Sequence, residues 1–494
     1  MTVKNNISRE SLLVMLPTSF HVDLEFFNAY TLGIVFMVDD DRKLIGVLTD
    51  GDARRDLLAG AALEDLITCD SNHFNKSPHY LPIDCEISEI WNLLNKDLRC
   101  IPLLDSSHRV VDYSTRSRLR QFMVLQPDIG EQEICNVLEC ITSGWISSQG
   151  RFIGVFETAF TDYLGGGNAL AVSNGTVALQ LALTTLGIGR GDEVIVPNFT
   201  FGASINAIVH SGATPVLADV DPDTWTIDLD ELCKMITPRT KAVMPVHIYG
   251  QPARIDEVME IAAEKGIFVV EDCAEALGAT YKNRRVGLDG DCACFSFFAN
   301  KSITTGEGGM VVFKNAEMAQ RARVLRDHGM SRQKRYWHDH AGFNFRMTNM
   351  QAAVGAAQMN RIEELIGRKK TIFQAYDRLL SLQQALSLLP NNTWSENSYW
   401  LYTIILSGYD ENVRDQLLKN LSCRGIDARP GFYPLHEMEP YRMFGHGTYP
   451  VSSYLSANSV CLPSSYGLSD EEIPHIAKIF IDELSKYSRE KTNE

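Results

Sequence analysis

The 494-residue sequence has few of the features that mark membrane, secreted or nucleic-acid-binding proteins. No apolar stretch approaches the roughly 20 residues that a membrane-spanning helix needs, and the polar start MTVKNNISRE does not resemble a secretory signal. There is no run of basic residues, and the formal charge of -16 opposes binding to nucleic acid or to an anionic membrane. These absences predict a cytoplasmic protein without nucleic-acid or membrane partners.

Cysteine pairs of the kind that bind zinc are absent as well. The sequence has 11 cysteines and no Cys-x-x-Cys pair. An odd number of scattered cysteines is typical of reduced thiols in the cytoplasm, so we expect neither disulfides nor a metal site. The chain is 45% hydrophobic and is long enough for roughly two to four domains of about 100–200 residues each.

From residue 170 to residue 270 the sequence alternates between short apolar runs and segments with helical spacing. The apolar runs predict strands at 170–172, 193–197, 214–220, 242–247 and 267–270. The segments between them predict helices at 177–186, 203–210, 229–236 and 255–265. This alternation is typical of a mostly parallel sheet covered by helices, with ligands bound at the carboxyl ends of the strands. The predicted fold class is therefore α/β.

One lysine, Lys301, stands between two further predicted strands. The apolar run 294–298 predicts a strand buried on both faces, and a glycine-rich turn precedes a second strand that resumes at Val311. A loop lysine is most often a solvated charge. Beside Phe297 and Phe298, however, the amine can lose its water until the neutral form is populated, as Schiff-base chemistry requires. Lys301 is thus the candidate for the covalent anchor of pyridoxal 5'-phosphate (PLP).

Three strand ends upstream carry groups suited to the same cofactor. Asn174-Gly175-Thr176 places a glycine and a hydroxyl at a predicted helix N-terminus, which favours a phosphate, although it is also an ordinary turn and cap. Asp272 follows an apolar strand, and a buried carboxylate there needs a partner such as the pyridinium nitrogen of PLP. Phe201 is placed to cover one face of the ring, or else to pack in the core.

These motifs together resemble those of the DegT-type nucleotide-sugar aminotransferases. The resemblance covers residues 132–485 and is carried by Asn174-Gly175-Thr176, Thr200-Phe201, Glu271-Asp272-Cys273-Ala274-Glu275-Ala276-Leu277-Gly278, Ser296-Phe297-Phe298-Ala299-Asn300-Lys301, residues 340–348 and residues 429–436. It implies a fold-type-I PLP-dependent transferase with a mostly parallel central sheet. The expected domains are a large PLP-binding domain at 126–383 and a smaller C-terminal α/β domain at 384–494.

The resemblance also implies roles for individual residues. Lys301 would carry PLP, Asp272 would hold its ring nitrogen, Phe201 would stack on the ring, and Gly175, Thr176 and Ser296 would bind its phosphate. Asn344 would reach that phosphate from the partner subunit of a homodimer with shared active sites. Glu275 stands where many relatives have glutamine, beside the phenolic oxygen of PLP, so it is expected to be protonated or to face the sugar.

The family moves an amino group from L-glutamate to a nucleotide-linked keto sugar. Residues 296–310 and 429–436 resemble GDP-perosamine synthases, which aminate GDP-4-keto-6-deoxy-D-mannose for surface polysaccharide (O-antigen) biosynthesis. A UDP- or dTDP-linked keto sugar is the alternative substrate, and a non-catalytic nucleotide sensor is the alternative function. His247, Arg429 and His436 are candidate substrate contacts, although His247 is equally well explained as a hydrogen-bonded core histidine.

The first 125 residues contain a candidate internal repeat. Predicted strands at 31–38 and 44–48, joined by a charged turn, are echoed about 65 residues later at 100–104 and 110–111. The pattern resembles a tandem cystathionine-β-synthase-type (CBS) domain pair, a module that binds adenine nucleotides in many proteins. Thr49 and Asp52 match its ribose-binding signature, but the second copy has no such aspartate. A ligand-free docking module is the alternative, because Thr-x-x-Asp is also an ordinary helix cap.

Overall fold

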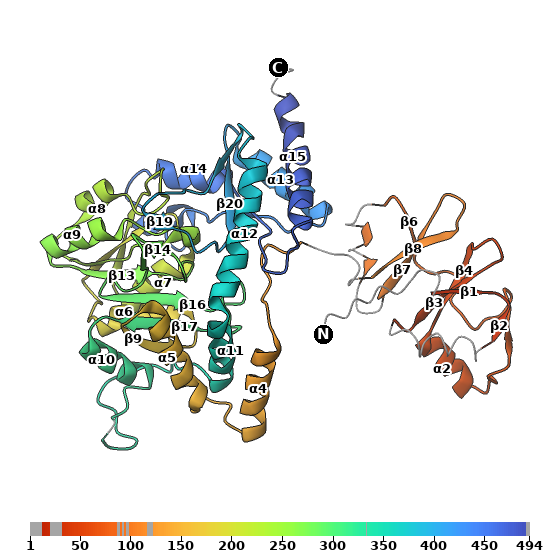
Figure 1. Cartoon of the computed structure of the whole chain (residues 1–494), viewed down its shortest axis with the longest axis horizontal. Helices are drawn as coiled ribbons and strands as arrows, with labels where there is room; N and C mark the ends of the chain where they lie inside the picture. Colours follow the sequence, from red (N-terminus) through yellow and green to blue (C-terminus); the bar gives the residue numbers. More distant parts are fainter. Residues whose placement is uncertain are drawn as a thin grey trace. The chain divides into compact units, whose positions relative to one another are not determined.

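The computed structural model describes residues 12–19, 32–85, 89–90, 93–94, 98–115, 122–331 and 333–490. The chain divides into two compact units (Figure 1). The first comprises residues 1–121 with 422–425, and the second comprises residues 122–421 with 426–494.

A seven-stranded sheet forms the centre of the second unit. Its strands are β9 (Asn168–Val172), β10 (Glu193–Pro197), β11 (Thr214–Ala218), β12 (Thr240–Val243), β13 (Phe268–Asp272), β16 (Cys292–Ser296) and β17 (Gly309–Phe313). They lie in the order β11-β10-β12-β13-β16-β17-β9. β17 pairs antiparallel with both of its neighbours, whereas the other pairings in this sheet are parallel. The expected mostly parallel sheet is confirmed.

Both faces of this sheet are buried, which explains the continuous apolar runs in its strands. Ala169 and Ala171 of β9 belong to one hydrophobic cluster, together with Phe295 of β16. Leu170 and Val172, which alternate with those alanines along β9, belong to a second cluster on the other face. Successive strand residues point to opposite faces, so a strand covered on both sides must be apolar throughout.

Helices connect and cover the strands. They are α4 (Glu131–Ser143), α5 (Arg151–Leu164), α6 (Gly175–Thr185), α7 (Gly202–Ser211), α8 (Leu229–Met235), α9 (Ile255–Lys265), α10 (Ala316–Arg326), α11 (Asn349–Asn360) and α12 (Ile362–Leu380). The predicted bounds of β10 and α9 match the observed ones. The predicted strand at 294–298 instead ends at Ser296, and Phe298 is exposed. The chain turns after this point, and the Lys301 N–H donates to the carbonyl oxygen of Phe298 (2.9 Å) within the turn.

An antiparallel sheet follows in the C-terminal part of this unit, in the order β18-β20-β22-β21. Its strands are β18 (Leu386–Leu388), β20 (Tyr402–Leu406), β21 (Arg429–Pro430) and β22 (Ser459–Leu462). One hydrophobic cluster joins its inner side chains to α12, α13 (Glu411–Cys423) and α15 (Glu472–Glu490). Among the residues that the structure describes, no helix is both long enough and apolar enough to cross a bilayer.

The first unit contains the repeat expected from the sequence. In one copy, β1 (Leu13–Met15) pairs parallel with β3 (Ile34–Val38), which pairs antiparallel with β4 (Leu44–Thr49). In the other copy, β6 (Leu81–Pro82), β7 (Cys100–Leu104) and β8 (Val110–Thr115) repeat the same pairings.

The two copies meet through equivalent turns. The N–H of Leu44 donates to the carbonyl of His108, and the N–H of Val110 donates to the carbonyl of Arg42, each at 3.1 Å. This reciprocal pairing relates the copies by a local two-fold arrangement.

Candidate active site

The carboxyl ends of several central strands open into one cavity of about 590 Å³. The residues that line it come from the segments after β9, β10, β13 and β16 and from the C-terminal part. The lining residues include Gly175, Thr176, Phe201, Ser204, Asp272, Glu275, Ser296, Asn300, Lys301, Trp400 and Phe432. Seven sequence-predicted cofactor residues, from Gly175 to Lys301, therefore share one cavity. Strand ends place ligands at this edge because parallel strands all finish there.

Lys301 has lost most of its water. Its side chain is 13% exposed, and its Nζ lies 3.8 Å from Oε1 of Glu275. The same Nζ lies 3.7 Å from the centre of the Trp400 ring, which is fixed because its Nε1–H donates to the Asn300 carbonyl (2.7 Å). Burial lowers the pKa of Lys301, although the charges of Glu275 and Asp272 oppose this shift. The neutral amine that nucleophilic chemistry requires is therefore easier to reach than in water.

Asp272 is a buried carboxylate held by two donors. It ends β13, its Oδ2 accepts a hydrogen bond from Oγ of Ser204 (2.7 Å), and its Oδ1 accepts one from the N–H of Ala274 (3.1 Å). Burial raises the pKa of Asp272, whereas these two hydrogen bonds and the charge of Lys301 lower it. A positive group in the cavity would thus stabilise the ionised form of this carboxylate.

The first turn of α6 and Ser296 form a narrow polar cradle. Asn174 caps the helix through Oδ1, which accepts the Val177 N–H at 3.0 Å. A Cβ atom at Gly175 would lie 2.8 Å from Cβ of Ser296, so only glycine allows this close approach. The first N–H groups of a helix have no acceptor within the helix, and its dipole favours an anion. The cradle therefore suits a phosphate group.

Glu275 lies beside Lys301, and its carboxylate is held in place by a hydrogen bond from Tyr249. Its Oε2 accepts the backbone N–H of Tyr249 at 2.8 Å. Tyr249 adopts a left-handed backbone conformation (φ 49°, ψ 26°), which is strained for a non-glycine residue. Its ring lies nearly parallel to the rings of both Trp400 and Phe432, with interplanar angles of 15° and 9°. Burial raises the pKa of Glu275 to about 7, although Lys301 opposes this shift.

These residues fit PLP. The cradle suits its phosphate, Asp272 suits its ring nitrogen, and Lys301 suits its aldehyde. Phe201 begins α7 at the mouth of the cavity with 60% of its surface exposed, which leaves a ring face free for stacking. Oδ1 of Asn300, another lining residue, is buried without a hydrogen-bond partner among the described residues. Fold and site together define a PLP-dependent transferase of fold type I.

The comparisons with known proteins name the family. The model of the DegT/DnrJ/EryC1/StrS aminotransferase family matches residues 127–480, and the chain belongs to this family. Over 361 residues it is 44% identical to a Caulobacter vibrioides protein named GDP-perosamine synthase, covering 73% of this chain and 97% of the relative. Proteins of the same name from Vibrio cholerae and Escherichia coli O157:H7 are 42% and 40% identical, covering 72% and 73% of this chain and 96% and 98% of their own lengths.

Solved structures agree with this assignment. The aminotransferase TlmJ from Streptoalloteichus hindustanus is 34% identical, with a TM-score of 0.70 over 74% of this chain and 99% of its own. A PLP-form structure from Streptococcus pneumoniae is 31% identical, with a TM-score of 0.70 over 73% of this chain and 98% of its own. The cofactor of this enzyme is PLP. The family match begins at residue 127, so residues 1–121, which make up nearly all of the first unit, lie outside it.

Three other sequence-predicted residues lie elsewhere in the second unit. Asn344 is exposed, and its Oδ1 accepts a hydrogen bond from Nε of Arg346 (3.1 Å). Arg429 is also exposed and pairs with Asp427 (3.1 Å). His436 is partly buried, and its Nδ1 lies 2.9 Å from the side-chain nitrogen of Asn198.

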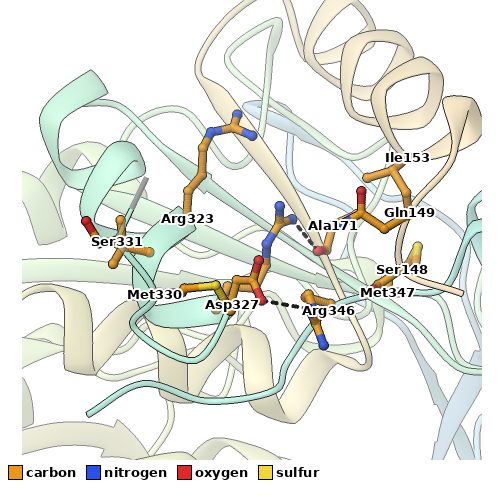
Figure 2. A pocket seen from close by; sticks show the side chains of 12 residues that line it. Ser148, Gln149, Ile153, Ala171, Arg323, Asp327, Met330, Ser331, Arg346 and Met347 are labelled. Atoms are coloured by element: carbon orange, nitrogen blue, oxygen red, sulfur yellow. Dashed lines mark hydrogen bonds and ion pairs between the residues drawn. The ribbon is translucent and has the colours of Figure 1, made fainter. Parts of the chain in front are cut away.

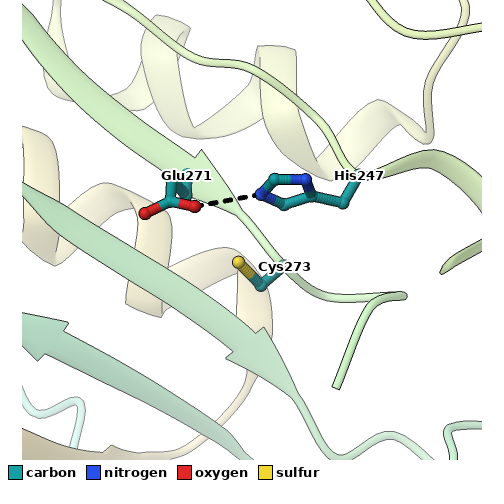
Figure 3. A group of neighbouring side chains, drawn as sticks. All are labelled: His247, Glu271 and Cys273. Carbon is teal, nitrogen blue, oxygen red and sulfur yellow. Dashed lines mark hydrogen bonds and ion pairs between the residues drawn. The ribbon is translucent and has the colours of Figure 1, made fainter. Parts of the chain in front are cut away.

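His247 is fully enclosed by the protein. Figure 3 shows it facing Glu271, with Nε2 at 3.1 Å from Oε2, while Nδ1 accepts the N–H of Ala253 at 3.0 Å. A sugar in the cavity cannot reach a side chain with no exposed surface. The structure thus gives His247 the alternative role, that of a hydrogen-bonded core histidine.

His247, Glu271 and Cys273 have ligand atoms close enough together to surround a metal ion (Figure 3). The oxygens of Glu271 already accept three backbone N–H groups, from Gly287, Asp289 and Gly290. This arrangement is that of a buried carboxylate satisfied by N–H donors rather than one awaiting a cation.

Sequence reasoning missed three residues of the site. Ser204 orients Asp272, Trp400 contacts Lys301, and Tyr249 holds Glu275. Trp400 is about a hundred positions away from Lys301 in the sequence, and no local pattern links the two. The left-handed conformation of Tyr249 has no signal in the sequence, because such a conformation is uncommon for any residue other than glycine.

Proposed function

We propose that this enzyme transfers the amino group of L-glutamate to carbon 4 of GDP-4-keto-6-deoxy-D-mannose. The product is GDP-perosamine, a precursor of surface polysaccharide such as O-antigen. Support comes from three relatives that carry the name GDP-perosamine synthase, are 40–44% identical and are covered over 96–98% of their lengths. The observation that carries the proposal is that Lys301, Asp272 and the phosphate cradle line one cavity.

The residues of the cavity would have different roles in amino transfer. PLP, when bound, supplies an electrophilic aldehyde and an electron sink for the carbon that gains or loses the amino group. Asp272 would pair with the protonated ring nitrogen of PLP. The cradle formed by Gly175, Thr176 and Ser296 would bind the phosphate of PLP. Lys301 would hold the aldehyde of PLP, and its free amine would be placed to carry a proton at the reacting carbon. Trp400, whose ring lies 3.7 Å from the Lys301 amine, shields that amine from water.

A coupled assay with GDP-, UDP- and dTDP-linked keto sugars tests the substrate. We expect amino-sugar formation from the GDP-linked 4-keto-6-deoxymannose and L-glutamate, and none with Lys301→Ala. Faster amination of a UDP- or dTDP-linked sugar would overturn the choice of nucleotide. A pure nucleotide sensor predicts no amino sugar with any member of the panel.

We also propose a homodimer in which Asn344 of each subunit contributes to the partner's phosphate cradle. Its exposure and its position outside the cavity of its own chain are consistent with a role in trans. Arg429 and His436 are the proposed contacts of the nucleotide sugar. The cytoplasmic location and the division between large and small domains at residue 383 remain predictions.

For the first unit we propose a CBS-type pair that binds an adenine nucleotide near Thr49 and Asp52. The paired copies described above support this proposal. Thr49 Oγ1 donates to Oδ2 of Asp52 (2.6 Å), and the two side chains form a capping box for α2 (Asp50–Leu58). A bound ribose would have to hydrogen-bond to the same Asp52 carboxylate that already takes part in this capping box. Calorimetric titration with ATP, ADP and AMP tests the proposal, because heat that is absent, or unaffected by Asp52→Ala, would leave a docking module.

A further inference from the structure

The chain enters the second unit from the first at two places that lie side by side. These places follow residue 121 and residue 425. Phe122 and Ile426, the first residues after each crossing, form a parallel bridge. The N–H of Asp427 donates to the carbonyl of Phe122 at 3.0 Å. A force that the first unit exerts on its attachments therefore acts on this bridge.

Residues 122–125, which we call the attachment segment, are fixed to the second unit through Val124. The N–H of Val124 donates to Oδ2 of Asp427 (3.1 Å), and its carbonyl accepts the N–H of Ser464 (3.0 Å). The side chain of Val124 is 1% exposed. The attachment segment is therefore part of the packed structure of the second unit, and the carboxylate of Asp427 is one of the groups that hold it.

Asp427 has a second partner, Arg429 of β21. Its Oδ2 accepts a hydrogen bond from Nη2 of Arg429 (3.1 Å), and its Oδ1 accepts one from Nε (3.4 Å). The carboxylate thus takes the side edge of the guanidinium, and Nη1 has no acceptor among the residues that the structure describes. The side chain of Arg429 is 49% exposed. Free guanidinium N–H groups are well suited to phosphate oxygens.

Arg346 shows how an arginine is placed when its guanidinium is fully used within the chain. Figure 2 shows it facing Asp327 across a pocket, with 2.6 Å between Nη1 and Oδ1. Its Nε donates to Oδ1 of Asn344 (3.1 Å), and its Nη2 lies 3.2 Å from Nε2 of His328. Each guanidinium nitrogen of Arg346 therefore has a partner, whereas Arg429 keeps one nitrogen for a ligand.

The segment that carries Arg429 also reaches the active site. Phe432, three residues later, lines the cavity, and its N–H donates to the hydroxyl of Tyr249 at 2.9 Å. Tyr249 and Val124 are each 1% exposed and belong to one hydrophobic cluster. Closely packed side chains of this kind have little room to move, whereas a half-exposed arginine can change its orientation. A change at the attachment segment therefore reaches Arg429 more easily than it reaches Lys301.

We propose that Asp427 is a positioning residue that orients Arg429 toward the diphosphate of the nucleotide sugar and ties this arginine to the attachment segment. The attachment of the first unit and the affinity for the nucleotide sugar are then linked, while the amino transfer itself is unaffected. The inference rests on the proposed function, in which Arg429 contacts the nucleotide sugar. It also gives a role to the attachment segment, which precedes the family match at residue 127.

Steady-state kinetics of the full-length holoenzyme give the first test. Asp427→Asn keeps an acceptor for the N–H of Val124 but removes the charge that orients Arg429. Loss of a partly exposed ion pair predicts roughly a two- to fivefold rise in KM for the nucleotide sugar, with an unchanged kcat and an unchanged glutamate half-reaction. Asp470→Asn is the matched control, because it removes an exposed ion pair with Arg368 (2.7 Å) and should leave KM as in the wild type. An unchanged or lowered KM in Asp427→Asn overturns the positioning role.

Arg429→Ala separates this inference from the proposed function. If the wild type aminates the GDP-linked sugar and Arg429→Ala raises KM but Asp427→Asn does not, the function stands and the positioning role is refuted. If Arg429→Ala leaves KM unchanged, the inference is refuted while amination by the wild type still upholds the function. The double variant should have the KM of Arg429→Ala alone, because Asp427 acts only through Arg429. Additive effects of the two substitutions would contradict this dependence.

Coupling between two sites is reciprocal, so a bound nucleotide sugar must also act on the attachment segment. Hydrogen exchange of the full-length holoenzyme is measured with and without GDP-4-keto-6-deoxy-D-mannose, in the absence of L-glutamate so that no turnover occurs. Peptides that contain Val124 should exchange more slowly with the sugar in the wild type and show no such change in Asp427→Asn. Val413 is the control, because its N–H also donates to an aspartate, Asp410 (2.9 Å), and its exchange should not respond.

Two outcomes of the exchange measurement would overturn the coupling. One is exchange at Val124 in the wild type that is the same with and without the sugar. The other is a sugar-dependent change that persists in both Asp427→Asn and Arg429→Ala. If the wild type aminates only UDP- or dTDP-linked sugars, the proposed substrate fails, and the same measurement with that sugar decides the coupling by the same outcomes.

Discussion

The amine of Lys301 and the carboxyl of Glu275 lie 3.8 Å apart in a cavity where both side chains are largely buried. Burial disfavours the charged form of each group, so it lowers the pKa of Lys301 and raises that of Glu275 to about 7. The pair therefore carries less charge near neutral pH than two exposed groups would. A weakly charged pair is suited to a lysine that must act as a nucleophile and then as a proton carrier.

The first prediction concerns the covalent anchor. Borohydride reduction of the holoenzyme followed by peptide mapping should place PLP on Lys301. Lys369 of α12 is an internal control, because it too is buried and burial lowers its pKa to about 7. Its Nζ donates to Oγ of Ser464 at 3.1 Å, outside the cavity. A label on Lys369 would show that low pKa alone, and not the site, selects the anchor.

Replacement of Asp272 by asparagine tests the charge at the ring nitrogen. Asp272→Asn keeps the shape and one acceptor but removes the negative charge, so it should retain PLP and slow the glutamate half-reaction by roughly 10²–10³-fold. Ser204→Ala, which removes only one hydrogen bond to this carboxylate, should cost less. The rate is measured as the change in absorbance of bound PLP during a single turnover with L-glutamate. A wild-type rate in Asp272→Asn is incompatible with the assigned role.

The raised pKa of Glu275 predicts that the free energy of unfolding of the cofactor-free enzyme depends on pH. Its pKa rises from 4.5 to about 7 on folding, so the folded state binds more protons between these pH values. Stability from this group is complete below pH 4.5 and is lost as the pH rises through about 7. Glu275→Gln should flatten this fall in denaturant titrations at several pH values. An unchanged slope in the variant would assign the pH dependence to other groups.

The cradle makes a steric prediction. Gly175→Ala would place a Cβ atom 2.8 Å from Cβ of Ser296, which must push the α6 N-terminus away from the phosphate. We expect PLP affinity to fall at least roughly tenfold, which is about 1.4 kcal/mol. Gly154→Ala in α5 is the matched control, because nothing lies within 4 Å of its added Cβ. That control should keep PLP and gain up to about 1 kcal/mol of stability, since alanine favours a helix over glycine.

The sequence predicts the sheet well because burial on both faces requires each strand to be an uninterrupted apolar run. β10 and α9 begin and end where the pattern does, since polar or glycine residues bound them. The end of β16 was placed too late because Phe297 and Phe298 continue the apolar run after the chain has turned.

The sequence predicts the residues of the site that carry the chemistry. It does not predict the neighbouring residues that position them. Asp272 ends a strand and Lys301 lies in the short connection between two strands, where a lone polar group is conspicuous beside apolar runs. Trp400, which covers Lys301, arrives from the C-terminal part through packing that no local pattern encodes. His247 also ends a predicted strand, but the partner that satisfies it, Glu271, is revealed only by the fold.

The last prediction is that two defective subunits can rebuild an active site. If Asn344 serves the partner's cradle, Lys301→Ala and Asn344→Ala homodimers are each impaired at both sites. A mixed dimer has one site with both defects and one site with neither. Random reassociation makes half of the dimers mixed, and half of their sites are intact, so activity should recover to about a quarter of the wild type in a two-fold dimer. Mixing with Asn349→Ala, which removes a buried hydrogen-bonding residue of α11 within its own chain, is not expected to complement in the same way. Activity no greater than the mean of the two parent variants would show that each site is built within one chain.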